Sequence, residues 1–387
     1  MDIRARVRSV ASSPAGFIIF LFLTSRVVLT IIGVASRLLL DSFHGREFPW
    51  HYSTHSWLSI WAVWDSGWYL DIAKSGYALS VLSDLPKAID PHQLNFGFFP
   101  LYPMLVGFVS RIFGGHLFIS GIAVSNVCLL CAAWFLHKLV ALDHGPQNAK
   151  RAVLFLFAFP TSFVLSGVFA ESLFLLISIL LFYGMKKEKF LFVFACGILL
   201  GLSRPTAVFA VPAVCLAYLA GKHFDIRKIG ISSLCCIGVP VGYGLFALFG
   251  YSVTGDWFFY THIKQVGWGS VWTNPLSLLV HCLMSHQVST LGNGTAVASG
   301  CIFIVALWKR IGMVYGILGL SLLVLPLTAG FMVIPGMMRY MAALFPLFVA
   351  CAALREGSVV DTAMITGLFM LQGFLMVFWT NGFSLIV

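Results

Sequence analysis

Seven ionisable side chains stand apart from the basic clusters of the chain and could take part in chemistry. In chain order they are Asp65, Glu171, Arg204, Asp256, His262, Lys264 and Arg339. Two arginines, a lysine and a histidine beside two or three acids suit an anionic, phosphate-bearing ligand with a group that must be deprotonated. Structural alternatives stay open. An arginine can simply anchor its helix, Glu171 can pair with Arg204 only to hold the fold, and His262 and Lys264 can be solvated.

Asp65 lies in the stretch IWAVWDSGWYLDIAKSGY, residues 60–77, for which we predict a helix in the membrane interface. At about 100° per residue, Asp65 shares one face of this helix with Trp61, Trp68, Tyr69 and Ile72. Asp71 and Lys74 fall on the opposite face, three residues apart, where they can pair. A carboxylate on the aromatic face is costly unless it has a partner or a task. Asp65 is therefore the candidate catalytic residue, and a helix N-cap or a snorkelling surface acid is the alternative.

The composition indicates an all-α polytopic membrane protein. Of 387 residues, 59% are hydrophobic and only 10% are charged, whereas a soluble domain carries about 25% charged residues. The mean hydropathy is +0.94. The net charge of +10 does not require nucleic acid as a partner, because Lys and Arg gather in cytoplasmic loops of membrane proteins. The nine cysteines lie mostly in apolar runs and form no pattern typical of a disulfide framework or a zinc site.

Hydropathy predicts a single integral membrane domain, residues 1–387, with about eleven transmembrane helices. The first outer loop covers 41–116 and the second covers 251–293; within the first, 98–113 is expected to be a juxtamembrane or re-entrant helix. Arg4, Arg6 and Arg8 place the N-terminus in the cytoplasm. The Lys and Arg clusters then fall inside and the seven ionisable residues outside. The predicted spans are about 15–40, 117–137, 151–168, 171–185, 190–203, 205–220, 229–250, 294–308, 311–331, 335–353 and 359–380.

Six motifs between residues 64 and 349 resemble a known family when they are read in order. They are WDSGWY, FFPLYP, FPTSFVLSGVFAESLF, GLSRPTA, GDWFFYTHIKQVGWG and RYMAALFPLFV. The set looks like the PIG-V-like mannosyltransferases of the GT-C superfamily of membrane glycosyltransferases. The resemblance implies a GT-C-like fold and an inverting transfer of a sugar, mannose above all, from a polyprenyl-phosphate-linked donor. The family's acid in the first outer loop matches Asp65, its Glu matches Glu171 and its Arg matches Arg204. The chain is short for the family, and its outer loops are compact.

On this reading Asp65 accepts the proton of the acceptor hydroxyl, and Arg204, Arg339 and Lys264 stabilise the phosphate as it leaves. Glu171 would position Arg204 or a sugar hydroxyl. The remaining candidates for substrate binding are His262, Gln265, Trp61 and Trp68. No cofactor is required. A divalent metal could be held by Asp65, Glu171 and Asp256, but no ligand spacing indicates one.

The expected partners are the lipid-linked donor, a lipid, glycan or protein acceptor, and membrane lipids. The expected site faces outward from a prokaryotic plasma membrane, or into the lumen of the endoplasmic reticulum in a eukaryote. Two other classes stay open. A transporter or lipid flippase also carries intramembrane charges, although transporter sites lie at the midplane and here the charges collect on one side. A catalytically inactive scaffold of a larger complex is the other.

Overall fold

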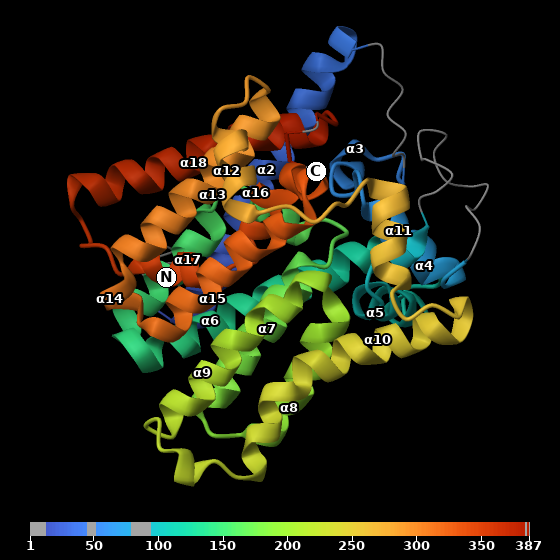
Figure 1. The fold of residues 1–387 in the computed structure, drawn as a ribbon. Coiled ribbons are helices and arrows are strands. Elements are labelled where there is room, and N and C mark those ends of the chain that lie inside the picture. The colour runs from blue at the N-terminus through green and yellow to red at the C-terminus, as the bar shows by residue number, and fades with distance from the viewer. Residues whose placement is uncertain (1–12, 45–51, 79–93, 384, 387) are drawn as a thin grey trace.

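The computed structural model describes residues 13–44, 52–78, 94–383, 385 and 386. The expectation for Arg4, Arg6 and Arg8 falls outside these residues. Every regular element in the described ranges is a helix (Figure 1). The all-α class predicted from composition is confirmed.

Five helical segments are long and apolar enough to cross a membrane, so the protein is a multi-pass membrane protein. They are α2 (Pro14–His44), α6 (Leu117–Ala158), Ile231–Thr254, which contains η5 (Ile231–Ile237) and α10 (Gly238–Thr254), α13 (Val288–Ala306) and α18 (Val359–Thr380). A sixth candidate is bent by 49° and combines η7 (Phe331–Gly336), α16 (Met337–Met341) and α17 (Phe345–Ala352). By length alone the described chain therefore offers five or six spans, and the count of eleven stays a prediction.

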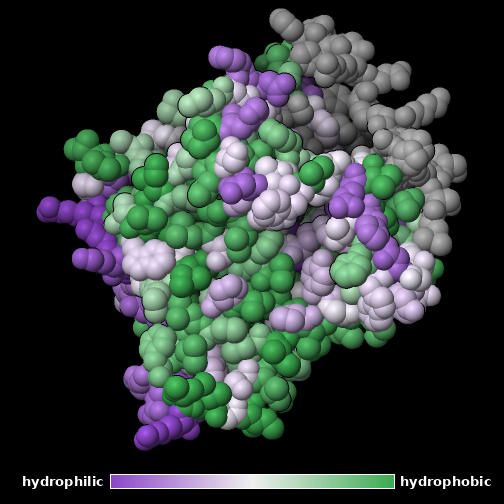
Figure 2. Space-filling model, in the orientation of Figure 1, coloured by the Kyte–Doolittle hydropathy of each residue, from purple (hydrophilic) through white to green (hydrophobic). Residues whose placement is uncertain are grey.

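Shorter helices complete the bundle. Apolar ones are α7 (Glu171–Lys186), α8 (Phe190–Ser203), η3 (Pro205–Ala210), α9 (Val211–Gly221), α15 (Met313–Val324) and η6 (Leu325–Ala329). Connecting turns include η4 (Ile226–Lys228) and α14 (Trp308–Ile311). Figure 2 shows a broad hydrophobic surface over the helices, with hydrophilic residues gathered at the end of α9, at α14 and before α18. Polar ends with an apolar belt between them are what a bilayer requires.

The third predicted span, 151–168, differs from the structure. The helix α6 is interrupted at Gly145, whose φ of 82° is left-handed, and Pro146 restarts it. It then ends at Ala158, and residues 159–170 contain only the short η2 (Ser162–Ser166). Backbone carbonyls freed by this break are satisfied from neighbouring helices: Gln372 donates to the carbonyls of Phe157 and Phe159. Irregular backbone at membrane depth is tolerated where protein supplies such partners.

The predicted helix over residues 60–77 is wrong in its first third. The chain forms α3 (Ser56–Ser59), a turn in which Trp64 has a φ of 53°, and α4 (Ser66–Ser75). The carbonyl of Trp61 accepts a hydrogen bond at 3.0 Å from the backbone N–H of Val168, in a distant segment. Helical periodicity within residues 60–77 cannot reveal that the carbonyl of Trp61 bonds to a residue a hundred positions away instead of within a helix. Asp65 directly precedes α4 instead of lying within it.

Within the segment 98–113 the helix α5 (Leu101–Ser110) has only ten residues, or about 15 Å, which is too short to cross a bilayer. Its placement as a juxtamembrane or re-entrant helix stays a prediction. The predicted second outer loop contains α11 (Phe259–Trp268) and α12 (Pro275–Leu283). Figure 1 shows α11 beside α4 and α5, and α11 also contacts η1 (Asn95–Gly97). Aromatic side chains join the two loops, including Phe96 and Phe259 at 5.6 Å between ring centroids. The loops therefore form one layer over this end of the bundle.

Candidate active site

The ends of three helices and one short helix bring the four central charges together. Glu171 is the first residue of α7, where a negative charge is favoured by the helix dipole. Arg204 follows α8 in an extended conformation that Pro205 imposes on the residue before it. Arg339 lies in the short helix α16. Asp65 sits at the N-cap position of α4, but its side chain makes no capping hydrogen bond and is free to reach Arg339.

The four side chains form a continuous chain of ion pairs. Arg339 Nη1 lies 2.8 Å from Asp65 Oδ2, and Arg339 Nε lies 3.1 Å from Glu171 Oε1. The same Glu171 oxygen lies 2.8 Å from Arg204 Nη1. Glu171, Arg204 and Arg339 have side chains exposed by 1%, 8% and 7%, whereas Asp65 is 24% exposed. Three charges are thus buried, and only the carboxylate at one end reaches solvent.

Charge balance explains how such a network is tolerated. Two guanidinium groups face two carboxylates, and an isolated buried charge would cost several kcal/mol. Aromatic faces add further stabilisation: Arg204 lies 4.5 Å from the ring centroid of Tyr340, and Arg339 lies 5.1 Å from that of Phe169. Glu171 Oε2 has no hydrogen-bond partner among the described residues. The network therefore fixes both arginines through one oxygen of Glu171, and the second oxygen, Oε2, can still accept a hydrogen bond.

The backbone beside Arg339 is fixed from two sides. Thr161 donates its hydroxyl to the carbonyl of Met338 at 2.7 Å, and the N–H of Met338 donates to Asn293 Oδ1 at 2.9 Å. Asn293 is fully buried and also donates to the carbonyls of Ser289 and Leu385. These contacts set the position from which Arg339 reaches its carboxylates.

A cavity of about 450 Å³ opens beside the network. Its walls come from the two predicted outer loops, from α10, from the end of α8 with the following η3, and from η6, η7 and α16. The charged and phenolic groups that line it are Asp65, Arg204, Arg339, Lys264, Tyr69, Tyr243, Tyr260 and Tyr340. Glu171 stands behind the arginines and does not belong to the lining. The cavity thus presents three cations and one carboxylate to whatever enters.

Lys264 approaches the cavity from α11. Its Nζ lies 3.9 Å from the ring centroid of Trp268 and 4.9 Å from that of Phe98. Burial lowers the pKa of Lys264 to about 8, and the nearby Asp65 opposes this shift. The lysine therefore titrates near physiological pH. Burial also raises the pKa of Tyr69 and Tyr260, so both phenols stay neutral.

The structure brings Asp65, Glu171, Arg204, Arg339 and Lys264 together. The other predicted site residues lie elsewhere. His262 is exposed and pairs with Asp256 at 2.6 Å, a hydrogen bond that lowers the pKa of Asp256. Gln265 is exposed on the same helix. Trp61 and Trp68 are buried, Trp68 against Phe98, and neither belongs to the cavity lining.

The sequence reasoning missed the tyrosines that line the cavity. Tyr69 was expected on the Asp65 face as part of an aromatic belt, and Tyr340 directly follows Arg339. Their closeness in sequence to the candidate residues Asp65 and Arg339 is the signal that could have identified them as site residues. Asp71 accepts a hydrogen bond at 2.9 Å from Asn95 Nδ2, and its expected pairing with Lys74 stays a prediction.

No protein-family model matches the chain, and no curated protein matches it in sequence. Among solved structures, the chain is similar to the oligosaccharyltransferase of Archaeoglobus fulgidus in complex with Zn and sulfate. The TM-score is 0.41 at 12% identity, over 94% of this chain and 53% of that one. The archaeal oligosaccharyltransferase AglB of the same organism, in complex with an inhibitory peptide and a dolichol-phosphate, gives 0.41 at 11% identity, over 95% and 56%. The chain thus spans about half the length of these structures, and such values assign no function to it.

Proposed function

We propose that this protein is a GT-C-type inverting glycosyltransferase that uses a polyprenyl-phosphate-linked sugar. The observation that carries the proposal is the cavity in which one partly exposed carboxylate, Asp65, meets two arginines and a lysine. A lipid-phosphate sugar is already activated, so the protein needs only to stabilise the departing phosphate and to accept one proton. The lining supplies both kinds of group.

The donor phosphate is expected to bind Arg204, Arg339 and Lys264, where fixed positive charge stabilises the negative charge that develops on departure. The acceptor hydroxyl attacks the anomeric carbon from the opposite face as the bond from that carbon to the phosphate oxygen breaks. Asp65 takes the hydroxyl proton. The products are the glycosylated acceptor with inverted configuration and the free polyprenyl phosphate. A single carboxylate suffices for this direct displacement.

In the structure Asp65 is paired with Arg339, which is one of the proposed phosphate ligands. A donor phosphate would replace the carboxylate at Nη1 of Arg339 and so free Asp65 to act as a base. Glu171 contacts Nε of the same guanidinium, a different nitrogen. It can therefore hold Arg339 in place while Asp65 is released.

The transferred sugar is proposed to be mannose, on the resemblance of the six motifs. Neither the motifs nor the cavity indicates the class of acceptor, so the test must cover lipid, glycan and protein acceptors. Membranes that contain the protein are supplied with polyprenyl-phosphate mannose, glucose and arabinofuranose as competing labelled donors, and lipid, glycan and protein fractions are then separated. We expect transfer from one of these donors, with inversion, and loss of that transfer in Asp65→Asn.

Two outcomes would contradict the proposal. One is transfer from a nucleotide sugar and from none of the lipid donors. The other is movement of a labelled lipid or solute across the membrane with no glycosidic product, which would favour a transporter or flippase.

A further inference from the structure

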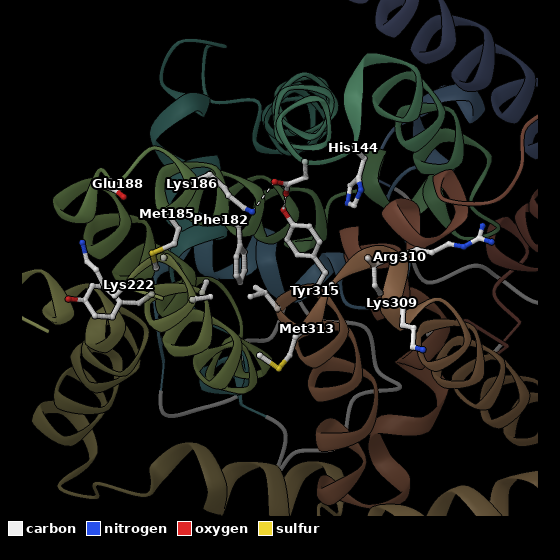
Figure 3. A pocket seen from close by; sticks show the side chains of 18 of the residues that line it. His144, Phe182, Met185, Lys186, Glu188, Lys222, Lys309, Arg310, Met313 and Tyr315 are labelled. Atoms are coloured by element: carbon white, nitrogen blue, oxygen red, sulfur yellow. Dashed lines mark hydrogen bonds and ion pairs between the residues drawn. The ribbon is translucent and has the colours of Figure 1, made fainter. Parts of the chain in front are cut away.

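A second cavity, of about 480 Å³, lies at the opposite end of α7 from the candidate active site (Figure 3). Lys186, the last residue of α7, lines it, whereas Glu171 begins the same helix. Fifteen residues of helical rise separate the two by about 22 Å. The second cavity is therefore a separate site near the other side of the helical layer.

Positive charge dominates the lining of this cavity. Four cations, Lys186, Lys222, Lys309 and Arg310, stand against two carboxylates, Asp143 and Glu188. Figure 3 shows Lys222 on one side of the cavity and Lys309 and Arg310 on the other. The guanidinium of Arg310 points away from the cavity and donates to the carbonyl of Ala353 at 2.7 Å. With four positive and two negative groups, the lining has an excess of two positive charges. An occupant with a negative charge would balance it.

Asp143 is already engaged and does not neutralise the rest of the lining. Its Oδ1 lies 2.8 Å from Lys186 Nζ, and its Oδ2 accepts a hydrogen bond at 2.6 Å from the hydroxyl of Tyr315 (Figure 3). These contacts tie α6, α7 and α15 together and fix one edge of the cavity. Nearby, the shielded Nε2 of His144 has no partner among the described residues.

The walls between these charges are apolar. They include Phe182, Met185, Phe190 and Met313, and Lys222 lies over the ring of Phe190 at 4.8 Å from its centroid. A small soluble anion would gain nothing from such walls. A molecule with a negative head and hydrocarbon chains would use both the basic groups and the apolar surface.

We propose that this cavity binds the head group of an anionic glycerophospholipid from the leaflet at that end of the bundle. The head group would lie at the rim of the cavity, where Lys222 and Lys309 carry positive charge on either side of it, with the acyl chains along the apolar walls. This site does not depend on the proposed transferase activity. It would fix the depth and tilt of α7 and α15 relative to the bilayer.

The test uses the full chain purified in a mild detergent. Native mass spectrometry and thermal unfolding measure the binding of phosphatidylglycerol, with phosphatidylcholine at equal concentration as the zwitterionic comparison. Because a lysine near an anionic lipid head contributes roughly fivefold to affinity, Lys222→Gln with Lys309→Gln is expected to weaken phosphatidylglycerol binding by roughly 30-fold. Phosphatidylcholine binding should not change. Lys222→Arg with Lys309→Arg should restore binding, which separates loss of charge from loss of fold.

The matched control is Lys187→Gln with Lys189→Gln. It removes two charges from the turn after α7, beside the cavity, at residues that do not line it. Equal weakening by the control pair would overturn the proposal, because it would indicate general attraction to a basic surface. Displacement of phosphatidylglycerol by an equimolar amount of inorganic phosphate would also overturn it, since the site would then take a free anion.

Discussion

Replacement of Asp65 by Asn tests the proposed chemistry most directly. Asn keeps the shape of the side chain and removes its ability to accept a proton. Loss of a general base costs at least about 100-fold in rate, or about 2.7 kcal/mol in the activation barrier. We therefore expect single-turnover sugar transfer to fall by at least about 100-fold.

The structure indicates that this variant will still fold. Asp65 is 24% exposed and contacts only one of the two buried arginines. Because this pair joins a partly exposed carboxylate to a buried guanidinium, its loss should cost more than the roughly 1 kcal/mol of a surface pair but less than the roughly 3–5 kcal/mol of a fully buried one. Glu171 stays in contact with both arginines. Binding of the donor should be retained, because removal of the competing carboxylate leaves Arg339 available to the phosphate.

The assay compares Asp65→Asn with Asp71→Asn at matched protein levels in membranes. Asp71 accepts a hydrogen bond from Asn95, and an amide oxygen at position 71 can accept it too, so this control should stay near the wild-type rate. If Asp65→Asn keeps more than about a tenth of the rate, Asp65 is not the base. If Asp71→Asn is inactive while Asp65→Asn is active, the assignment of Asp65 as the base is wrong.

The other predictions concern the groups around Asp65. Glu171→Gln leaves two buried guanidinium groups without their shared carboxylate and should destabilise the protein by about 3–5 kcal/mol, seen as a lower Tm in detergent; an unchanged Tm would refute this. Lys264 is charged below its pKa of about 8 and neutral above it. Affinity for the lipid-phosphate donor should therefore fall about tenfold between pH 7 and 9, and Lys264→Met should abolish that dependence. If donor affinity still falls between pH 7 and 9 in Lys264→Met, the pH dependence belongs to another group. Thr161→Val removes the hydrogen bond that fixes the backbone beside Arg339. It should lower the transfer rate several-fold with little change in Tm, whereas equal losses in both would indicate a purely structural role.

Local signals in the sequence were sufficient to predict the bounds of helices whose ends are marked by charged residues or proline. The predicted spans 171–185 and 190–203 agree closely with Glu171–Lys186 and Phe190–Ser203. Charged residues and Pro205 delimit these apolar runs, and each of these signals acts on its own neighbourhood. The ten-residue helix α5 could likewise be judged too short to cross, from its length and prolines.

Signals from distant segments were not visible in the sequence. The break before Asp65 depends on backbone groups that bond to Val168, and helical periodicity cannot register such a partner. Asn293, which forms an N-glycosylation sequon with Gly294 and Thr295, is another case. As a motif it indicates a surface loop, but its side chain holds the backbone of Met338 inside the protein. In both cases tertiary contacts override what the local pattern favours.

The pairing of Asp65 with Arg339 bears on how this site could avoid wasteful reaction. A free carboxylate base beside an activated sugar would also deprotonate water, and the donor would be hydrolysed. In the structure the base is held by the cation that the phosphate is proposed to occupy. The carboxylate and the phosphate thus compete for Nη1 of Arg339, while Nε stays bound to Glu171. Arrival of the donor would release the base only when the phosphate is already in place, so substrate binding and activation of Asp65 would be one event.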